Sequence, residues 1–161
     1  MTRNLMKGFA LFVAAAMLAA AGQALANGYG KQKVVYHINY DDPKAQTGAL
    51  RNVQNHINAV GAENLDLKVV LHGNGLALLV TPDALAELPK FKHGNADATM
   101  AATIDNLRGQ GVQFQVCNNT VVGRDVDVAK HLHFVEDKDI VPSGVAELAH
   151  LQAQGYTYIK P

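Results

Sequence analysis

The chain has 161 residues with 14 basic and 14 acidic side chains, and it contains no tryptophan. No basic run or stripe occurs, so we expect neither nucleic acid nor an anionic membrane surface as a partner. A single cysteine, Cys117, excludes an internal disulfide. The fold must therefore be stabilised by its hydrophobic core.

Residues 1–26 have the pattern of a secretory signal peptide. Arg3 and Lys7 give a basic start, an apolar run covers 9–21, and Ala24-Leu25-Ala26 offers a cleavage site. The run is shorter than the roughly 20 residues that span a bilayer, which favours cleavage over an uncleaved anchor. We expect a flexible junction at 27–32, one domain over 33–161, a periplasmic location and no membrane contact after signal cleavage.

Strand and helix patterns then alternate along the chain. A β-branched and aromatic run over 33–40 predicts a strand closed by a turn at 41–43, and apolar residues at helical spacing predict a helix over 50–60. A second buried strand is predicted at 67–72. Two shorter pieces follow: the apolar 76–80 is either strand or helix, and 82–88 is a helical turn or two.

The second half of the chain repeats this alternation. A helix is predicted over 95–108, and the period-two pattern of 112–116 predicts a strand that Cys117 ends, followed by a short helix to about 126. Residues 128–139 show no clear pattern. The remaining elements are a short strand at 140–141, a helix at 143–154 and a last strand at 156–159. This order predicts an α/β fold whose parallel sheet is covered on both faces.

Three short segments fall at the predicted carboxyl ends of strands, where chemistry gathers in such sheets. They are His37-Ile38-Asn39-Tyr40, His72-Gly73-Asn74-Gly75 and Cys117-Asn118-Asn119-Thr120. A cysteine between a strand end and a helix start meets unpaired backbone N–H groups that favour the thiolate. The alternative is a structural Cys117 that serves as a small buried hydrophobe. The polar residues after it and an oxidising compartment favour the reactive thiol.

The other candidates give weaker signals. His72 is either an acid, base or anion binder beside the thiol or a turn residue satisfied by backbone, and for this segment alone the turn is preferred. Leu78 stands where a dinucleotide fingerprint needs its third glycine, so no nucleotide cofactor is expected. His131-x-His133, with His93 or His150, has a spacing that metals use. No carboxylate or thiol stands at ligand spacing, and neither a metal nor any other cofactor is predicted.

Three stretches resemble the exported branch of the DsrE/DsrF-like (YchN-like) family. They are GVQFQVCNNT at 111–120, VLHGNG at 70–75 and the tail from 141 to 161, and the likeness covers nearly all of 32–161. The resemblance implies a three-layer α/β/α domain with a five-stranded, mostly parallel sheet, assembled into homotrimers or hexamers. It also implies that Cys117 matches the cysteine that carries a persulfide in sulfur-relay members.

Two functions are weighed on this basis. In the first, the protein is a periplasmic sulfur carrier or sulfurtransferase-like protein that holds sulfane sulfur on Cys117 between donor and acceptor proteins. In the second, it is a non-catalytic oligomeric protein that binds a small ligand or a partner, and Cys117 is structural. The expected ligand-binding side chains are His37, His72, Asn74, Asn118 and Asn119. A redox sensor ranks last because the chain has no resolving thiol.

Overall fold

The computed structural model describes residues 28–161, so the predicted signal peptide at 1–26 lies outside the described residues. Lys31–Pro161 forms one compact unit. Its sheet has five strands, all parallel, in the order β4-β3-β2-β1-β5. The strands are β1 (Gln32–Ile38), β2 (Leu65–Leu71), β3 (Gln113–Cys117), β4 (Ile140–Val141) and β5 (Thr157–Ile159). The expected five-stranded parallel sheet is confirmed.

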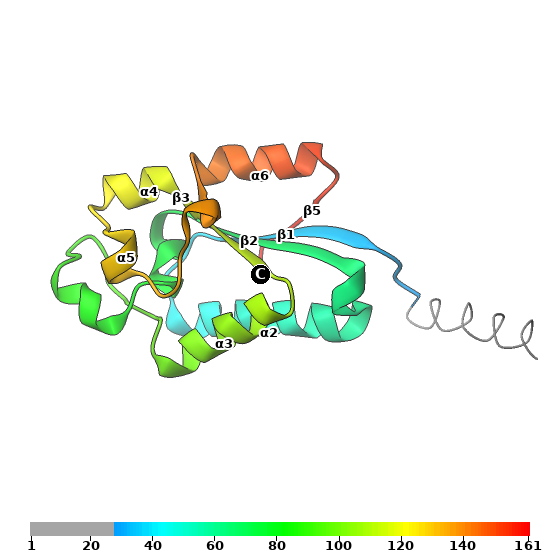
Figure 1. Cartoon of the computed structure of the whole chain (residues 1–161), viewed down its shortest axis with the longest axis horizontal. Helices are drawn as coiled ribbons and strands as arrows, with labels where there is room; N and C mark the ends of the chain where they lie inside the picture. The colour runs from blue at the N-terminus through cyan, green and yellow to red at the C-terminus, as the bar shows by residue number, and fades with distance from the viewer. Residues whose placement is uncertain (1–27) are drawn as a thin grey trace, which may run out of the picture. The chain divides into compact units, whose positions relative to one another are not determined.

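Helices cover both faces of this sheet (Figure 1). α2 (Pro43–Val60) and α3 (Ala98–Gly109) lie on one face, and α6 (Gly144–Ala153) lies on the other with the shorter α4 (Asn118–Gly123) beside it. The strand order explains the positions of α2, α3 and α6, because β1 to β4 progress toward one edge and α6 returns the chain to β5 at the opposite edge. Right-handed crossovers in opposite directions place their helices on opposite faces. The three-layer α/β/α fold is thus the predicted one.

Short helical segments occupy the connections. Residues 76–80, which the sequence left open, belong mostly to a 3₁₀ segment at Gly73–Leu78, and a second one covers Pro82–Ala86. The unassigned stretch after 127 forms α5 (Val128–His131) and a 3₁₀ turn at Asp137–Asp139. Among the described residues, no helix is both long and apolar enough to cross a membrane.

Helix α2 begins seven residues earlier than the apolar spacing predicts. Asp42 caps it by accepting from the N–H of Ala45 at 2.7 Å, and Pro43 occupies its first position. Both residues also favour turns, so the sequence pattern predicted only a turn after the preceding strand at this point. Strand β1 correspondingly stops at Ile38 rather than at residue 40.

The two faces of the sheet are packed very differently. The α2 and α3 face holds the main core, which includes Tyr36 and Ile38 of β1 and the fully buried Phe114 of β3. The α6 face holds a small cluster of five buried residues: Val35, Val70, Leu148, Leu151 and Tyr156. Because side chains alternate along a strand, the small-core face also receives His37 after Val35, and Cys117 at the end of β3.

A buried glutamine ties the carboxyl ends of the strands together. Gln46 of α2 is fully buried and donates to the carbonyl oxygens of Tyr40 at 2.7 Å and Gly75 at 3.3 Å. It also accepts from the side chain of Asn95 at 2.7 Å. Gly75 itself packs against β1, since a Cβ built on it would lie 2.0 Å from the carbonyl oxygen of Ile38. The glycine therefore permits backbone to approach backbone.

We predict that Gly75→Ala lowers the free energy of unfolding by about 3 kcal/mol, the upper end of overpacking costs, because neither backbone can give way. Gly48→Ala in α2 is the matched control, since a Cβ there meets nothing within 4 Å. It should raise the free energy of unfolding by about 0.5–1 kcal/mol. Urea denaturation of both variants checks the pair, and equal stability of the two would contradict the packing described.

Candidate functional site

Cys117 closes β3 and stands immediately before α4. The residue is only 5% exposed, although both asparagines that follow it are exposed. Burial raises the pKa of its thiol. Four donors outweigh burial and bring the pKa below its usual value: the backbone N–H groups of Gly144, Thr120 and Asn119 and the hydroxyl of Thr120. Each donates toward the sulfur, so the thiolate is the form that this environment favours.

Gly144 brings helix α6 directly onto the thiol. It is the first residue of α6, whose cap Ser143 accepts from the N–H of Ala146. A Cβ built on Gly144 would lie 2.9 Å from Cβ of His72 and 3.2 Å from Cβ of Cys117. A larger side chain would push α6 away from the strand ends. The absence of a side chain therefore lets the Gly144 N–H reach the sulfur.

Thr120 links the thiol to the end of β2. Its hydroxyl oxygen accepts from the N–H of Gly73 at 2.8 Å, and its O–H donates toward Cys117. The side chain is only 9% exposed, so the hydroxyl is held in place by packing as well as by these bonds. Thr120 thus connects the His72-Gly73 segment to the cysteine.

The two predicted histidines meet on the same face of the sheet. Nε2 of His37 lies 2.7 Å from Nε2 of His72, and the ring planes are inclined by 21° with their centroids 4.7 Å apart. Nδ1 of His37 lies 2.6 Å from the hydroxyl of Tyr158 in β5. Burial, followed by the fields of His72 and Lys160, lowers the pKa of His37 to about 4. Burial and Lys160 also lower the pKa of His72, so both imidazoles are neutral near pH 7.

The three asparagines named from the sequence take other positions. Asn74 is exposed, and its amide oxygen accepts from Arg124 at 2.5 Å rather than from the histidine pair. Asn118 and Asn119 are exposed at the first turn of α4, where Asn119 offers its backbone N–H to the thiol. The structure therefore gathers His37, His72 and Cys117 at one strand-end row, with the asparagines around it.

His131 and His133, the pair with metal-like spacing, contact separate carboxylates. His131 lies 3.4 Å from Glu87, and His133 lies 2.8 Å from Asp105. Within residues 28–161, no group of three or more potential ligands could hold a metal ion.

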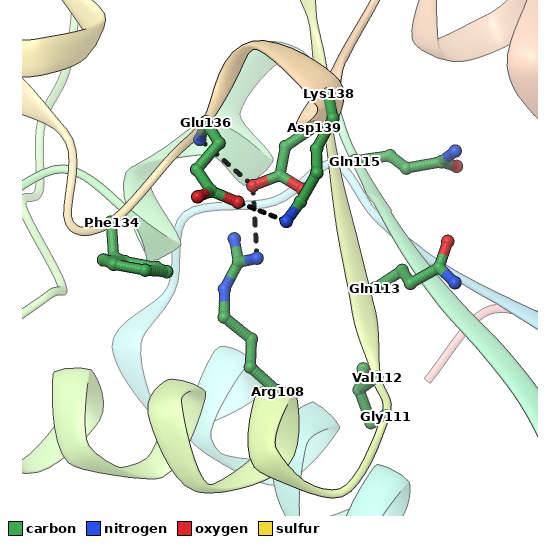
Figure 2. Close-up of a pocket in the computed structure, with 9 residues that line it drawn as sticks. All are labelled: Arg108, Gly111, Val112, Gln113, Gln115, Phe134, Glu136, Lys138 and Asp139. Carbon is green, nitrogen blue, oxygen red and sulfur yellow. Dashed lines mark hydrogen bonds and ion pairs between the residues drawn. The ribbon is translucent and has the colours of Figure 1, made fainter.

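A cavity of about 540 Å³ lies at the edge of β3, away from the predicted site residues (Figure 2). Arg108 rises into it from the end of α3, pairs with the buried Asp139 at 3.1 Å and has Phe134 beside its guanidinium. Lys138 pairs with Glu136 above it. These paired charges hold the turn that leads into β4, and we assign them a structural role.

Three residues of the site were not predicted as site residues from the sequence. Thr120 lies three positions after Cys117, a spacing that returns to the same side of a helix, so a local signal existed. Gly144 follows a recognisable helix cap at Ser143, but its contact with Cys117 depends on where α6 packs against the sheet. Tyr158 meets His37 only through the pairing of β5 with β1, which no local pattern reveals.

We predict that Thr120→Val raises the pKa of the Cys117 thiol by about one unit, the scale of one hydrogen bond to a charged group. The pH dependence of alkylation by iodoacetamide measures it. Thr120→Ser keeps the hydroxyl and should behave like the wild type. Thr103→Val removes a hydroxyl that bonds only within α3 and serves as the control. An unchanged thiol pKa in Thr120→Val would show that the hydroxyl does not act on the sulfur.

The histidine pair predicts a loss of stability in mild acid. Between pH 6.5 and about 4, His37 binds a proton in the unfolded chain but not in the folded one, so the free energy of unfolding falls as the pH falls through this window. We expect His37 to account for about 2–3 kcal/mol of that fall. The difference between wild type and His37→Gln in urea denaturation at pH 7 and pH 4 isolates this contribution. Parallel pH curves for the two proteins would refute it.

Comparison with known proteins places this geometry in a family. The model of the DsrE/DsrF-like family matches residues 33–161. A solved protein of unknown function from Methanobacterium thermoautotrophicum is similar, with a TM-score of 0.63 and 27% identity over 81% of this chain and 100% of that one. Curated protein sequences give no match. The chain belongs to the DsrE/DsrF-like family, which is associated in general with sulfur relay.

Proposed function

We propose that the protein is a periplasmic sulfur carrier that holds sulfane sulfur as a persulfide on Cys117. The observation that carries the proposal is the set of four donors around a nearly buried thiol. A thiolate is the nucleophile in sulfur transfer, and this set favours it without any partner cysteine. Family membership supports the same chemistry.

Loading is a displacement at sulfur. The Cys117 thiolate attacks the outer sulfur of a persulfide donor, R–S–SH, and forms a new S–S bond while the donor's own S–S bond breaks. Its electron pair leaves with the donor as R–S⁻, so no oxidant or reductant is needed. The outer sulfur now belongs to Cys117–S–SH. The N–H groups that face the thiolate also favour the anionic form of this persulfide.

Unloading depends on the same lowered thiol pKa of Cys117, which here makes the cysteine a good leaving group. An acceptor thiolate attacks the outer sulfur, and Cys117 leaves as a thiolate. A thiol of lower pKa leaves faster, so the donors that activate Cys117 as a nucleophile also help it to depart. Transfer in both directions is what a carrier needs.

Location and assembly are further parts of the proposal. The signal-peptide pattern at 1–26 supports export, and with it membership of an exported branch of the family. The family resemblance supports a homotrimer or hexamer. Val122 of α4 and Val145 of α6 are 66% and 65% exposed on the two helices that flank Cys117, which is consistent with contact to another copy or to a donor or acceptor protein.

The low exposure of Cys117 favours a second candidate function. At 5% exposure the thiol can also be part of the wall of a non-catalytic binding site formed around His37 and His72. The two candidates differ in thiol reactivity. A cysteine that reacts with Ellman's reagent only after unfolding would support the binding protein over the carrier.

Incubation with a persulfide or thiosulfate donor tests the carrier function. We expect intact-mass spectrometry to show an added mass of about 32 Da, one sulfur atom, that dithiothreitol removes. Cys117→Ser is the control and should gain nothing. Absence of the added mass on the wild type, or equal addition on the serine variant, would exclude a Cys117 persulfide.

A further inference from the structure

Three polar side chains form a hydrogen-bonded row that leads across the sheet toward Cys117. Tyr158 contacts Nδ1 of His37 at 2.6 Å, and Nε2 of His37 contacts Nε2 of His72 at 2.7 Å. The strand order β5-β1-β2-β3 explains the row, because each side chain comes from the next strand and projects to the α6 face. The hydrogen bonds therefore follow the order of the strands in the sheet.

The row has two possible hydrogen-bond orders. A neutral imidazole carries one N–H, so at the contact between the rings one Nε2 donates and the other accepts. When Tyr158 donates to His37, His37 donates to His72, and the proton of His72 sits on Nδ1. In the reverse order His72 donates to His37, His37 donates to Tyr158, and Nδ1 of His72 carries no proton. Exchange between the two orders moves one proton along the whole row.

A proton relay needs one end in contact with solvent and a free nitrogen at the other end. Tyr158 is 39% exposed, so its side chain borders solvent. At the other end, Nδ1 of His72 has no hydrogen-bond partner among residues 28–161 and is not buried. His72 and Cys117 both pack against Gly144. A ligand at the thiol therefore lies beside the His72 side chain.

The charges around the row leave it free to pass a proton. Lys160 acts on both rings and itself donates to Asn39 at 2.6 Å. On α6, which covers this face, Glu147 accepts from Gln115 at 2.9 Å. No described carboxylate forms a hydrogen bond or ion pair with either imidazole, so neither ring is fixed in one tautomer by an anion.

We infer that Tyr158, His37 and His72 form a proton relay from solvent to the group that leaves when Cys117 is loaded. The inference rests on the proposed function, because it adds an acid to the loading step. As R–S⁻ departs, it takes the Nδ1 proton of His72 and becomes R–SH, while in the same concerted shift His72 takes a proton at Nε2 from His37 and His37 takes one at Nδ1 from Tyr158. Each ring receives a proton as it gives one up, so no imidazolate forms. Tyr158 then takes a proton from an acid in solvent.

The relay makes loading depend on the basicity of the leaving group. An alkyl thiolate is basic enough to gain from protonation, whereas thiosulfate releases sulfite, which departs as an anion and needs no proton. With glutathione persulfide we expect Tyr158→Phe to slow loading about tenfold, below the usual range for acid catalysis because thiolates leave well by themselves. Loading from thiosulfate should change less than about twofold. The rate of added mass on Cys117 measures both.

Two controls separate a relay from a structural role. Tyr36→Phe removes another tyrosine-to-histidine contact of β1, the 3.1 Å bond to His56 on the opposite face, and should leave both rates unchanged. Alkylation of Cys117 by iodoacetamide involves no leaving thiolate, so Tyr158→Phe should not affect it. Equal slowing of alkylation and of both donors would mean that Tyr158 only shapes the thiol, and no slowing with glutathione persulfide would also overturn the relay.

A spectroscopic test does not depend on loading. Nitrogen-15 NMR of the histidines at pH 7 should show that the two rings differ in tautomer, one protonated on Nδ1 and the other on Nε2, or exchange between the two orders. Charged rings, or a fixed Nδ1–H tautomer of His37 that survives in Tyr158→Phe, would overturn the row as a proton path. If the wild type gains no sulfur from either donor, the proposed carrier function is wrong. The NMR result then still tests whether the three side chains form a proton path.

Discussion

Parallel pairing of β1, β2, β3 and β5 determines which side chains meet at the site. Within a strand, side chains alternate between the faces, so the pairing register decides whether His37, His72 and Cys117 share one. A slip of one residue would move a histidine into the main core and bring an aliphatic side chain beside the thiol. The main core on the other face opposes such a slip, because it would expose residues such as Phe114.

The thiol and the imidazoles have separate electrostatic roles. In many thiol enzymes an imidazolium next to the cysteine stabilises the thiolate. Here both histidines are neutral, and backbone N–H groups with one hydroxyl stabilise the anion. The thiolate therefore keeps its stabilisation when a proton moves along the imidazoles, which allows nucleophile and acid to operate side by side.

The sequence predicted the layers, the strand end at Cys117 and the two strand-end histidines, because these depend on local periodicity and on the general behaviour of parallel sheets. It did not predict the contacts of Tyr158 with His37 or of Gly144 with Cys117, which join residues far apart in the chain. The start of α2 was misplaced for another reason, since Asp42 and Pro43 are equally good turn and helix-start residues.

The unequal packing of the two faces has a consequence for access to the thiol. Helix α6 rests on a cluster of only five buried residues, yet its first residue covers Cys117. The free energy of local opening follows the apolar contacts that must be broken, so among the described elements this layer can detach while the main core stays folded. Sub-global unfolding of α6 would then expose the sulfur to a large partner protein, and the marginal attachment of this helix would act as a gate.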